Sequence, residues 1–293
     1  MSNIVNTSIT FLNHSSVLLE HKSTVIFTDP FYDKPAFETW APSPPCATNP
    51  AYLLAMSKSG NNFAIMVSHG HDDHCDDRLL KLFNHCTIII TKFSSPGLRN
   101  RITSLGYTKI IEIDEEPIKF HDVELSAFIN EKRSHDDSLQ VINFPDLTFV
   151  HANDCWWSID DKHLKIINSI KKNKVHFASQ ITVADGYPFA YTSFTEKACM
   201  DIVRKMTVDR IISALTNAQN LNADNFIHYA GHVKIFSTNE RVNQYSGFVE
   251  DKFNMSKISN FIPSDITFIS LMKPILTLLN IFSKTFENSA SSI

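Results

Sequence analysis

The segment that most constrains the fold is residues 63–74, where an apolar run leads directly into a cluster of metal-binding residue types. Residues 63–67 read FAIMV, without a polar position. This is typical of a strand that is buried on both faces of a sheet covered by helices. Residues 69–74 then read HGHDDH. Packing does not require such a cluster, whereas imidazole and carboxylate groups are ligands of zinc, iron and manganese. The segment therefore predicts a metal site at the end of a central strand.

The spacing of this cluster divides it into two pairs of ligands. His69 and His71 are two residues apart, so in an extended segment they point the same way and can share one metal. Asp73 and His74 come just before an expected helix over residues 76–84 and face a second position. One loop thus offers ligands to two metals about 3.5–4 Å apart, the separation found in two-metal hydrolases. A polar loop that is merely rich in histidine is the alternative.

The pattern His-x-His-x-Asp-His after a strand resembles the signature of the metallo-β-lactamase superfamily, and the resemblance extends over roughly residues 8–245. It implies an α/β fold, a four-layer αββα sandwich of two mixed β-sheets with helices outside. It also implies a catalytic domain over residues 1–250. Residues 251–293 are then expected to form a C-terminal amphipathic appendage and a disordered tail.

The resemblance implies further ligands elsewhere in the chain. His135 lies between two apolar segments and looks like the family's third histidine, and Asp154 ends an apolar run and looks like its bridging aspartate. The last histidine is either His228, which the local pattern favours, or His232. The implied set places His69, His71 and His135 on metal one, Asp73, His74 and His228 (or His232) on metal two, and Asp154 between them.

Four other residues are candidates around the metals. Asp29 is expected to orient a ligand histidine or the loop backbone. His14 either faces the substrate or is a hydrogen-bonded structural residue, and His151 either faces the site or belongs to the core. Tyr187 is either a substrate contact or a turn anchor before Pro188.

The ligand set implies hydrolysis of a small-molecule ester, lactone or phosphodiester, with two divalent cations (Zn, Mn or Fe) as cofactors. Water held between two cations becomes a hydroxide near neutral pH, and Asp73 and His228 are the candidate catalytic residues. A di-iron redox enzyme or oxygenase that acts on a small metabolite is one alternative, because the same ligand types bind iron. A non-catalytic scaffold with a vestigial site is another.

Two branches of the superfamily share local patterns with this chain. Residues 11–20 and 27–30 look like the opening hairpin of the branch that holds ascorbate-6-phosphate lactonases and N-acyl phosphatidylethanolamine phospholipases D. Residues 153–155, 186–188 and 230–231 resemble the metallo-β-lactamase-like part of CMP-N-acetylneuraminate hydroxylases. That hydroxylase also carries a Rieske module, which needs paired Cys-x-His and Cys-x-x-His elements. The five cysteines of this chain are scattered and form none.

Composition restricts which binding partners and which cellular compartment we expect for this chain. A net charge of −4 argues against a nucleic-acid surface, which needs clustered Lys and Arg. Five irregularly spaced cysteines predict a reducing, cytoplasmic location, and the first residues lack the basic and apolar regions of a signal peptide. A small-molecule substrate is expected as the partner, and a homo-oligomer through the C-terminal segment is possible.

Several segments outside the metal motif carry structural predictions of their own. Residues 33–62 hold five prolines and form either a lid that shapes the substrate site or a structural surface loop. Residues 266–282 are too short and too interrupted for a membrane span, so they are expected to pack on the domain or on a partner subunit rather than on a membrane surface. A helix is predicted over residues 195–205 and a strand over residues 210–213.

Overall fold

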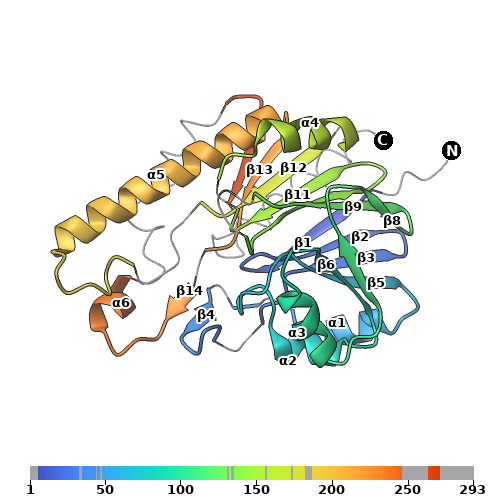
Figure 1. The fold of residues 1–293 in the computed structure, drawn as a ribbon, viewed down its shortest axis with the longest axis horizontal. Coiled ribbons are helices and arrows are strands. Elements are labelled where there is room, and N and C mark those ends of the chain that lie inside the picture. The colour runs from blue at the N-terminus through green and yellow to red at the C-terminus, as the bar shows by residue number, and fades with distance from the viewer. Residues whose placement is uncertain are drawn as a thin grey trace, which may run out of the picture.

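The computed structural model describes residues 6–32, 35–43, 45–46, 48–130, 132, 135–155, 157–172, 174–181, 187–231, 233–245 and 263–270. Within them, two β-sheets pack face to face, and helices cover the outer face of each sheet (Figure 1). Because an apolar sheet face must be buried against another element, this four-layer arrangement encloses three of the four apolar cores found among these residues.

The first sheet has six strands in the order β1 (Ser8–Asn13), β2 (Ser16–His21), β3 (Thr24–Thr28), β5 (Asn62–Val67), β6 (Thr87–Thr91) and β7 (Ile110–Ile113). The second has seven, in the order β15 (Thr267–Ser270), β13 (Asn225–His228), β12 (Val175–Ser179), β11 (Thr148–Asn153), β10 (Leu139–Asn143), β9 (Val123–Phe128) and β8 (Ile118–Phe120). Each sheet combines parallel and antiparallel pairs. A separate pair joins β4 (Trp40–Pro42) to β14 (Val233–Ile235).

The helices are α1 (Pro50–Ser57), α2 (Asp77–Leu82), α3 (Gly97–Ser104), α4 (Asp161–Ile170), α5 (Glu196–Asn220) and α6 (Glu240–Tyr245). Buried side chains of α1, α2 and α3 pack on the first sheet, and those of α4 and α5 pack on the second. The predicted αββα sandwich of two mixed sheets is therefore confirmed.

Strand β5 shows how the sequence produces these layers. Ala64 and Met66 belong to the core between the two sheets, whereas Ile65 and Val67 belong to the core beneath the helices. Side chains alternate along a strand, so a strand with a core on each side must be apolar at every position. The strand expected over residues 63–67 is confirmed, and it ends directly before the histidine cluster.

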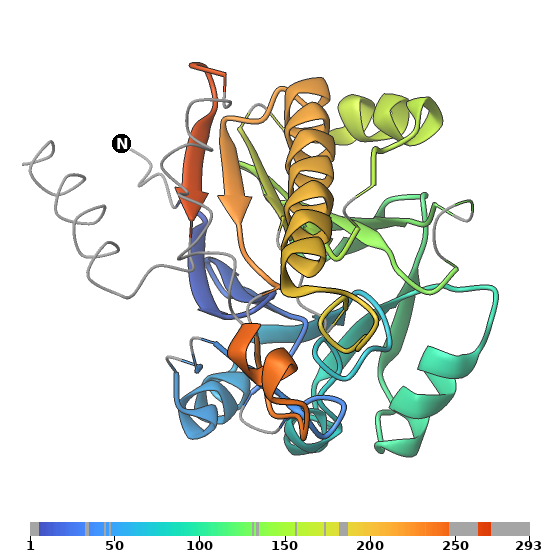
Figure 2. The same cartoon turned by 90° about the vertical axis from the view of Figure 1, so that its left-hand side faces the viewer.

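The predicted strand over residues 210–213 is wrong, because those residues lie inside α5. This helix also extends the predicted helix over residues 195–205 as far as Asn220, along the outer side of the second sheet (Figure 2). Ile211, Leu215 and Ala218 are buried in the core of that sheet, at spacings of four and three residues. This helical spacing, and not the β-branched pair at 211–212, determines the structure.

The C-terminal part joins the second sheet. Thr267–Ser270 form β15, which pairs in parallel with β13 of the second sheet. Residues 246–262 and 271–293, including the rest of the 266–282 segment and the tail, lie outside the described residues, and the domain boundary at residue 250 stays a prediction. Among the described residues, no helix is both long and apolar enough to cross a membrane.

Candidate metal centre

Side chains from the ends of several strands meet at one edge of the two sheets. The HGHDDH loop follows β5, Asp154 follows β11, and His14 lies in the turn between β1 and β2. His14, His69 and His74 are fully buried. Residues that are far apart in the sequence therefore form one polar cluster within an otherwise apolar interior.

The ligand atoms form two neighbouring groups. One consists of His14, Asp73 and His74, the other of His69, His71 and Asp154, and within each group all the ligand atoms lie within 4.8 Å of one another. Within the motif, His69 and His71 lie in one group, and Asp73 and His74 lie in the other. The Oδ1 atom of Asp154 also lies 3.4 Å from Nε2 of His74 in the first group. Asp154 therefore stands between the two groups.

Distances and missing hydrogen bonds both fit a bound cation. The Oδ2 atom of Asp73 lies 3.3 Å from Nε2 of His14 and 3.6 Å from Nε2 of His74. Two atoms that bind one tetrahedral zinc lie about 3.3–3.6 Å apart. Among the described residues, both of these nitrogens and Oδ1 of Asp154 are buried without a hydrogen-bond partner. Each such atom costs about 1–3 kcal/mol unless something binds it, so their convergence favours a cation.

The local charge points the same way. Burial opposes a charge on His74, but the carboxylates of Asp154, Asp73 and Asp29 raise its pKa well above 6.5. A place where three carboxylates favour a proton on an imidazole also favours a metal cation. Burial and the neighbouring His74 instead lower the pKa of His69 to about 3. At neutral pH the His69 imidazole is therefore uncharged and has a lone pair for a metal.

Asp29 determines which nitrogen His69 and His74 present to the cluster. Its Oδ2 atom accepts hydrogen bonds from Nδ1 of His74 at 2.8 Å and from Oγ of Ser68 at 2.7 Å, and Oδ1 accepts from the Ser68 amide at 2.8 Å. Because the Ser68 hydroxyl donates to Asp29, its oxygen accepts from Nδ1 of His69 at 2.9 Å. Both histidines then carry hydrogen on Nδ1, and Nε2 is the nitrogen that each presents to the cluster. There the Nε2 atom of His69 lies 2.9 Å from Nδ1 of His71.

Arg101 on α3 holds the loop from the outside. Its guanidinium donates hydrogen bonds to the carbonyl oxygens of Gly70 at 2.6 Å and Cys75 at 2.9 Å, and to carboxylate oxygens of Asp72 at 3.0 Å and Asp77 at 2.7 Å. The loop is thus tied down on both sides of Asp73 and His74. Sequence reasoning missed this residue, because an arginine on a helix carries no pattern that marks it.

Four residues at this edge adopt the left-handed backbone region. These are His14 (φ 41°), Asp29 (φ 38°), Asn153 (φ 39°) and Ala230 (φ 61°). Such conformations cost about 1–3 kcal/mol each outside glycine and tend to gather at functional sites. The Ala230 amide donates to the His14 carbonyl at 2.9 Å, which joins the loops of the two sheets.

His135 is not brought into either group, although the resemblance implies it as a ligand. Its side chain is exposed. Two residues later in the same loop, Oδ1 of Asp137 lies 3.6 Å from Nε2 of His69 and 3.9 Å from Nδ1 of His71. Asp137 lies closer than His135 to the start of β10, and β10 ties this end of the loop to the second sheet. The ligand role of His135 stays a prediction.

The other candidates lie in different places. His228 is buried at the end of β13 but belongs to neither group of ligand atoms, and His232 lies outside the described residues. Tyr187 is partly exposed, with its ring 5.6 Å from that of Tyr191. Phe37, from the proline-rich segment, lies with its ring 6.3 Å from the ring of His71. Part of the proline-rich segment therefore flanks the HGHDDH loop.

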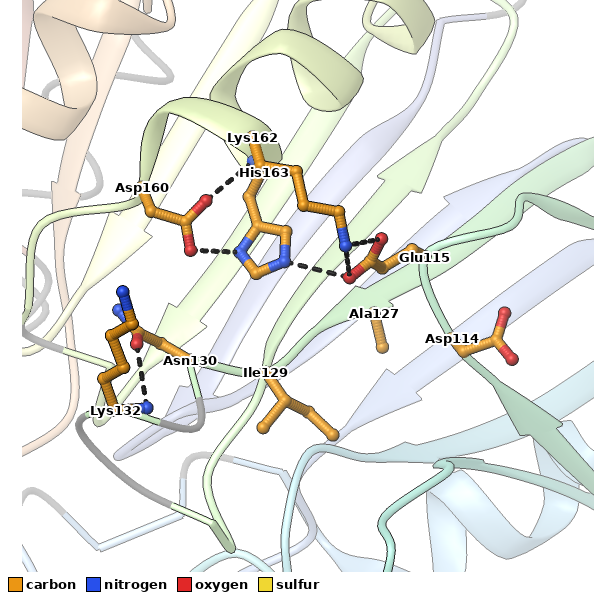
Figure 3. A pocket seen from close by; sticks show the side chains of 9 residues that line it. All are labelled: Asp114, Glu115, Ala127, Ile129, Asn130, Lys132, Asp160, Lys162 and His163. Carbon is orange, nitrogen blue, oxygen red and sulfur yellow. Dashed lines mark hydrogen bonds and ion pairs between the residues drawn. The ribbon is translucent and has the colours of Figure 1, made fainter.

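A single histidine among carboxylates, His163, lines a cavity of about 390 Å³ elsewhere in the fold (Figure 3). The cavity lies beside Asn130 and Lys132, which belong to the same β9–β10 loop as Asp137. Here His163 is held between two carboxylates, with Nε2 3.0 Å from Glu115 and Nδ1 3.0 Å from Asp160. Both ring nitrogens thus have a partner within the protein.

Comparison with protein families agrees with this geometry. Residues 8–171, more than half of the chain, match the model of the beta-lactamase superfamily domain. The chain belongs to this superfamily. Comparison with curated protein sequences gives no match.

Several solved structures share the superfamily fold with this chain. CmlA, a diiron beta-hydroxylase from Streptomyces venezuelae, is 16% identical with a TM-score of 0.57, over 91% of this chain and 53% of CmlA. A possible metal-dependent hydrolase from Veillonella parvula is 16% identical with a TM-score of 0.53, over 90% and 96%. Igni18, a metallo hydrolase from Ignicoccus hospitalis, is 13% identical with a TM-score of 0.50, over 90% and 94%. This chain spans about half the length of CmlA, and at these identities the likeness is one of fold.

Proposed function

We propose that this beta-lactamase superfamily protein is a metal-dependent hydrolase of a small-molecule ester, lactone or phosphodiester. The observation that carries the proposal is the pair of adjacent His/Asp groups, with Asp154 between them. Imidazole and carboxylate donors suit zinc, manganese and iron. The expected cofactors are two divalent cations.

The residues that would hold the cations follow from the two groups. His14, Asp73 and His74 would hold one cation, and His69, His71 and Asp154 the other. When bound, the pair supplies Lewis acidity to the scissile group and activates a water molecule for attack. His135, His228 and His232 remain candidates to complete these sets.

The chain's own residues prepare the site for this reaction. Asp29 and Ser68 accept hydrogen bonds from the Nδ1 atoms of His74 and His69, so Nε2 is the nitrogen that each ring turns toward a cation. Burial opposes ionisation of Asp73, but His74 and His14 lower its pKa, so it stays a carboxylate and can serve as an anionic ligand of a cation. His228, the other candidate catalytic residue, lies at the end of β13, outside both groups of ligand atoms.

The side chains also indicate where a substrate enters. His71 and Asp154 are 44% and 26% exposed, whereas His14 and His74 are buried. The second group therefore opens to solvent and the first does not. A substrate is expected to approach over His71, beside Phe37.

Chelation and reconstitution test this function. The full chain would be stripped of metal, reloaded with Zn²⁺, Mn²⁺ or Fe²⁺, and assayed on a nitrophenyl ester, a simple lactone and bis(nitrophenyl) phosphate. We expect hydrolysis of at least one class that needs metal, disappears in Asp154→Asn and persists in His163→Ala. Hydrolysis that survives chelation, or that persists in Asp154→Asn, would contradict the proposal.

A di-iron redox enzyme is the second candidate, and the likeness to the diiron beta-hydroxylase CmlA favours it. The same donor types serve iron. Iron retained through purification, a visible absorption band and consumption of O₂ with a reductant would support this candidate. Zinc or manganese at two equivalents, together with hydrolysis, would favour the first candidate. No uptake of any of these metals on titration would leave the scaffold alternative.

A further inference from the structure

Behind Asp29 lies a buried pair of residues that the proposed mechanism does not use. His151 is on β11 and Tyr229 follows β13, and both are fully buried. The Nε2 atom of His151 lies 2.8 Å from Oδ2 of Asp29, and its Nδ1 atom lies 2.5 Å from the Tyr229 hydroxyl. That hydroxyl also lies 3.1 Å from the backbone amide of Asn153. A continuous chain of hydrogen bonds therefore runs from Asn153 to Asp29.

The two ends of this chain determine its direction. The Asn153 amide can only donate, so the Tyr229 oxygen accepts from it and the Tyr229 hydrogen is left for Nδ1 of His151. At the other end an ionised carboxylate can only accept, so Nε2 of His151 donates to Asp29. This is the arrangement in which each group meets a partner of the opposite kind.

Asp29 is the point where this chain meets the candidate metal centre. Its Oδ2 atom, which accepts from His151, also accepts from Nδ1 of His74 and from the Ser68 hydroxyl that binds His69. Nδ1 of His74 also lies 3.0 Å from Oγ of Ser15. Asp29 is completely buried, and a buried carboxylate depends on such donors to remain ionised.

Without the Tyr229 hydroxyl, no hydrogen bond from this residue would fix which ring nitrogen of His151 carries the hydrogen. His151 could then carry its hydrogen on Nδ1 and turn a lone pair toward the Asp29 carboxylate, which is repulsive. Asp29 would shift, and the donors from His74 and Ser68 would lose a well-placed acceptor. Because the chain starts at Asn153, next to Asp154, the same change would loosen the loop that carries Asp154.

We propose that Tyr229 and His151 are positioning residues that align Asp29, and through it His69 and His74, for cation binding. The inference rests on the proposed function, because it assumes that these histidines bind metal. It adds that residues of the second sheet, on β11 and after β13, prepare ligands that follow β5 of the first sheet.

Zinc titration of Tyr229→Phe is the main test, and Tyr107→Phe is its matched control. Tyr107 is also a buried tyrosine, and its hydroxyl donates to the Leu80 carbonyl at 2.9 Å, outside this chain of hydrogen bonds. Loss of a residue behind a metal ligand costs about 10–100-fold in metal affinity. We expect Zn²⁺ affinity to fall about tenfold in Tyr229→Phe, the lower end of that range, and to stay unchanged in Tyr107→Phe.

Rescue and NMR separate positioning from general loss of stability. His151→Leu removes both hydrogen bonds, whereas His151→Gln keeps one N–H donor and one oxygen acceptor, so we expect zinc affinity in the order wild type, His151→Gln, His151→Leu. Imidazole ¹⁵N spectra of the zinc-loaded wild type should show His151 with hydrogen on Nε2. In Tyr229→Phe the hydrogen should move partly or wholly to Nδ1.

The outcomes distinguish the two proposals. If the wild type takes up zinc but Tyr229→Phe binds it as tightly, or if wild-type His151 carries hydrogen on Nδ1, the positioning role is overturned and the proposed function stands. If the wild type takes up none of Zn²⁺, Mn²⁺ and Fe²⁺, both are overturned.

Discussion

The cluster around His74 and the cluster around His163 have similar composition and opposite organisation. Each places buried imidazole among carboxylates, several rings around His74 and the single ring of His163 in the other. At His163 both ring nitrogens lie 3.0 Å from a carboxylate, and Lys162 neutralises Glu115 at 2.7 Å (Figure 3). At His74 the Nε2 atom faces two carboxylates at 3.4 and 3.6 Å without a hydrogen bond among the described residues.

This difference distinguishes an ion-pair network from a candidate ligand set. In the first case the protein satisfies its own polar groups, so nothing further is needed. In the second the atoms are held at the spacing of ligands around one ion. His176 adds a third case, because neither of its ring nitrogens has a hydrogen-bond partner among the described residues. Burial and Lys174 lower its pKa to about 4, so it remains a neutral core residue.

The comparison is tested most strongly by removing one histidine from each cluster. His74→Ala should lose more than about 100-fold in Zn²⁺ affinity, because it removes a ligand and not merely a residue behind one. His163→Ala should bind Zn²⁺ like the wild type. Isothermal titration of the metal-free proteins measures both. Equal losses would mean that the two clusters do not differ in kind.

Replacement of Arg101 tests whether the HGHDDH loop needs the hydrogen bonds from α3 to keep its shape. Arg101→Met should lower the free energy of unfolding by about 2 kcal/mol, because it removes charged hydrogen bonds to two loop carbonyls. Arg99→Met on the same helix removes an exposed pair with Glu112 and should cost less than about 1 kcal/mol. Urea denaturation without metal compares them. A loss no larger than that of the control would show that the loop holds its shape without Arg101.

The β9–β10 loop tests the edge of the metal cluster. Asp137→Asn should weaken Zn²⁺ binding about tenfold, because it removes a negative charge 3.6 Å from Nε2 of His69. His135 is exposed, so His135→Ala should change binding less than about threefold. Zinc titration of the two variants measures both changes in affinity. If His135→Ala instead abolishes one equivalent, the ligand set implied by the family resemblance is right at this position.

The smallest effect is expected at His176. The folded protein keeps this residue neutral down to about pH 4, while the unfolded chain protonates it below pH 6.5. Its stabilising contribution is therefore complete above pH 6.5 and declines as the pH falls toward 4. Between pH 6.5 and 5.5 the wild type should lose about 1 kcal/mol more stability than His176→Gln in the presence of a chelator. Parallel curves would show that His176 accepts a proton in the fold.

The sequence was informative where local pattern and tertiary structure agree. The apolar run at residues 63–67 predicted a strand buried on both faces, and β5 is such a strand. His69 and His71, two residues apart, lie in the same group of ligand atoms. The helix after the loop begins one residue later than predicted, because Asp76 caps it through the Arg78 and Leu79 amides. Such features depend on neighbours in sequence.

The rest depended on contacts between distant segments. His14 joins a ligand group because the β1–β2 turn meets the β5 loop, and no local pattern marks it. His151 could be read as a site or a core residue, and only its contact with Asp29 shows that it touches the support of the site. The sequence predicted a helix and a separate strand where the structure has the single helix α5, because Ile211 and Ile212 are β-branched and look like a strand. Packing on the second sheet favours the helix.

Anomalous diffraction at the zinc edge, from crystals of the full chain grown with zinc, tests the central claim most directly. The account predicts two zinc peaks, one beside His14, Asp73 and His74 and one beside His69, His71 and Asp154. No peak at either group, or a peak only beside His163, would contradict it.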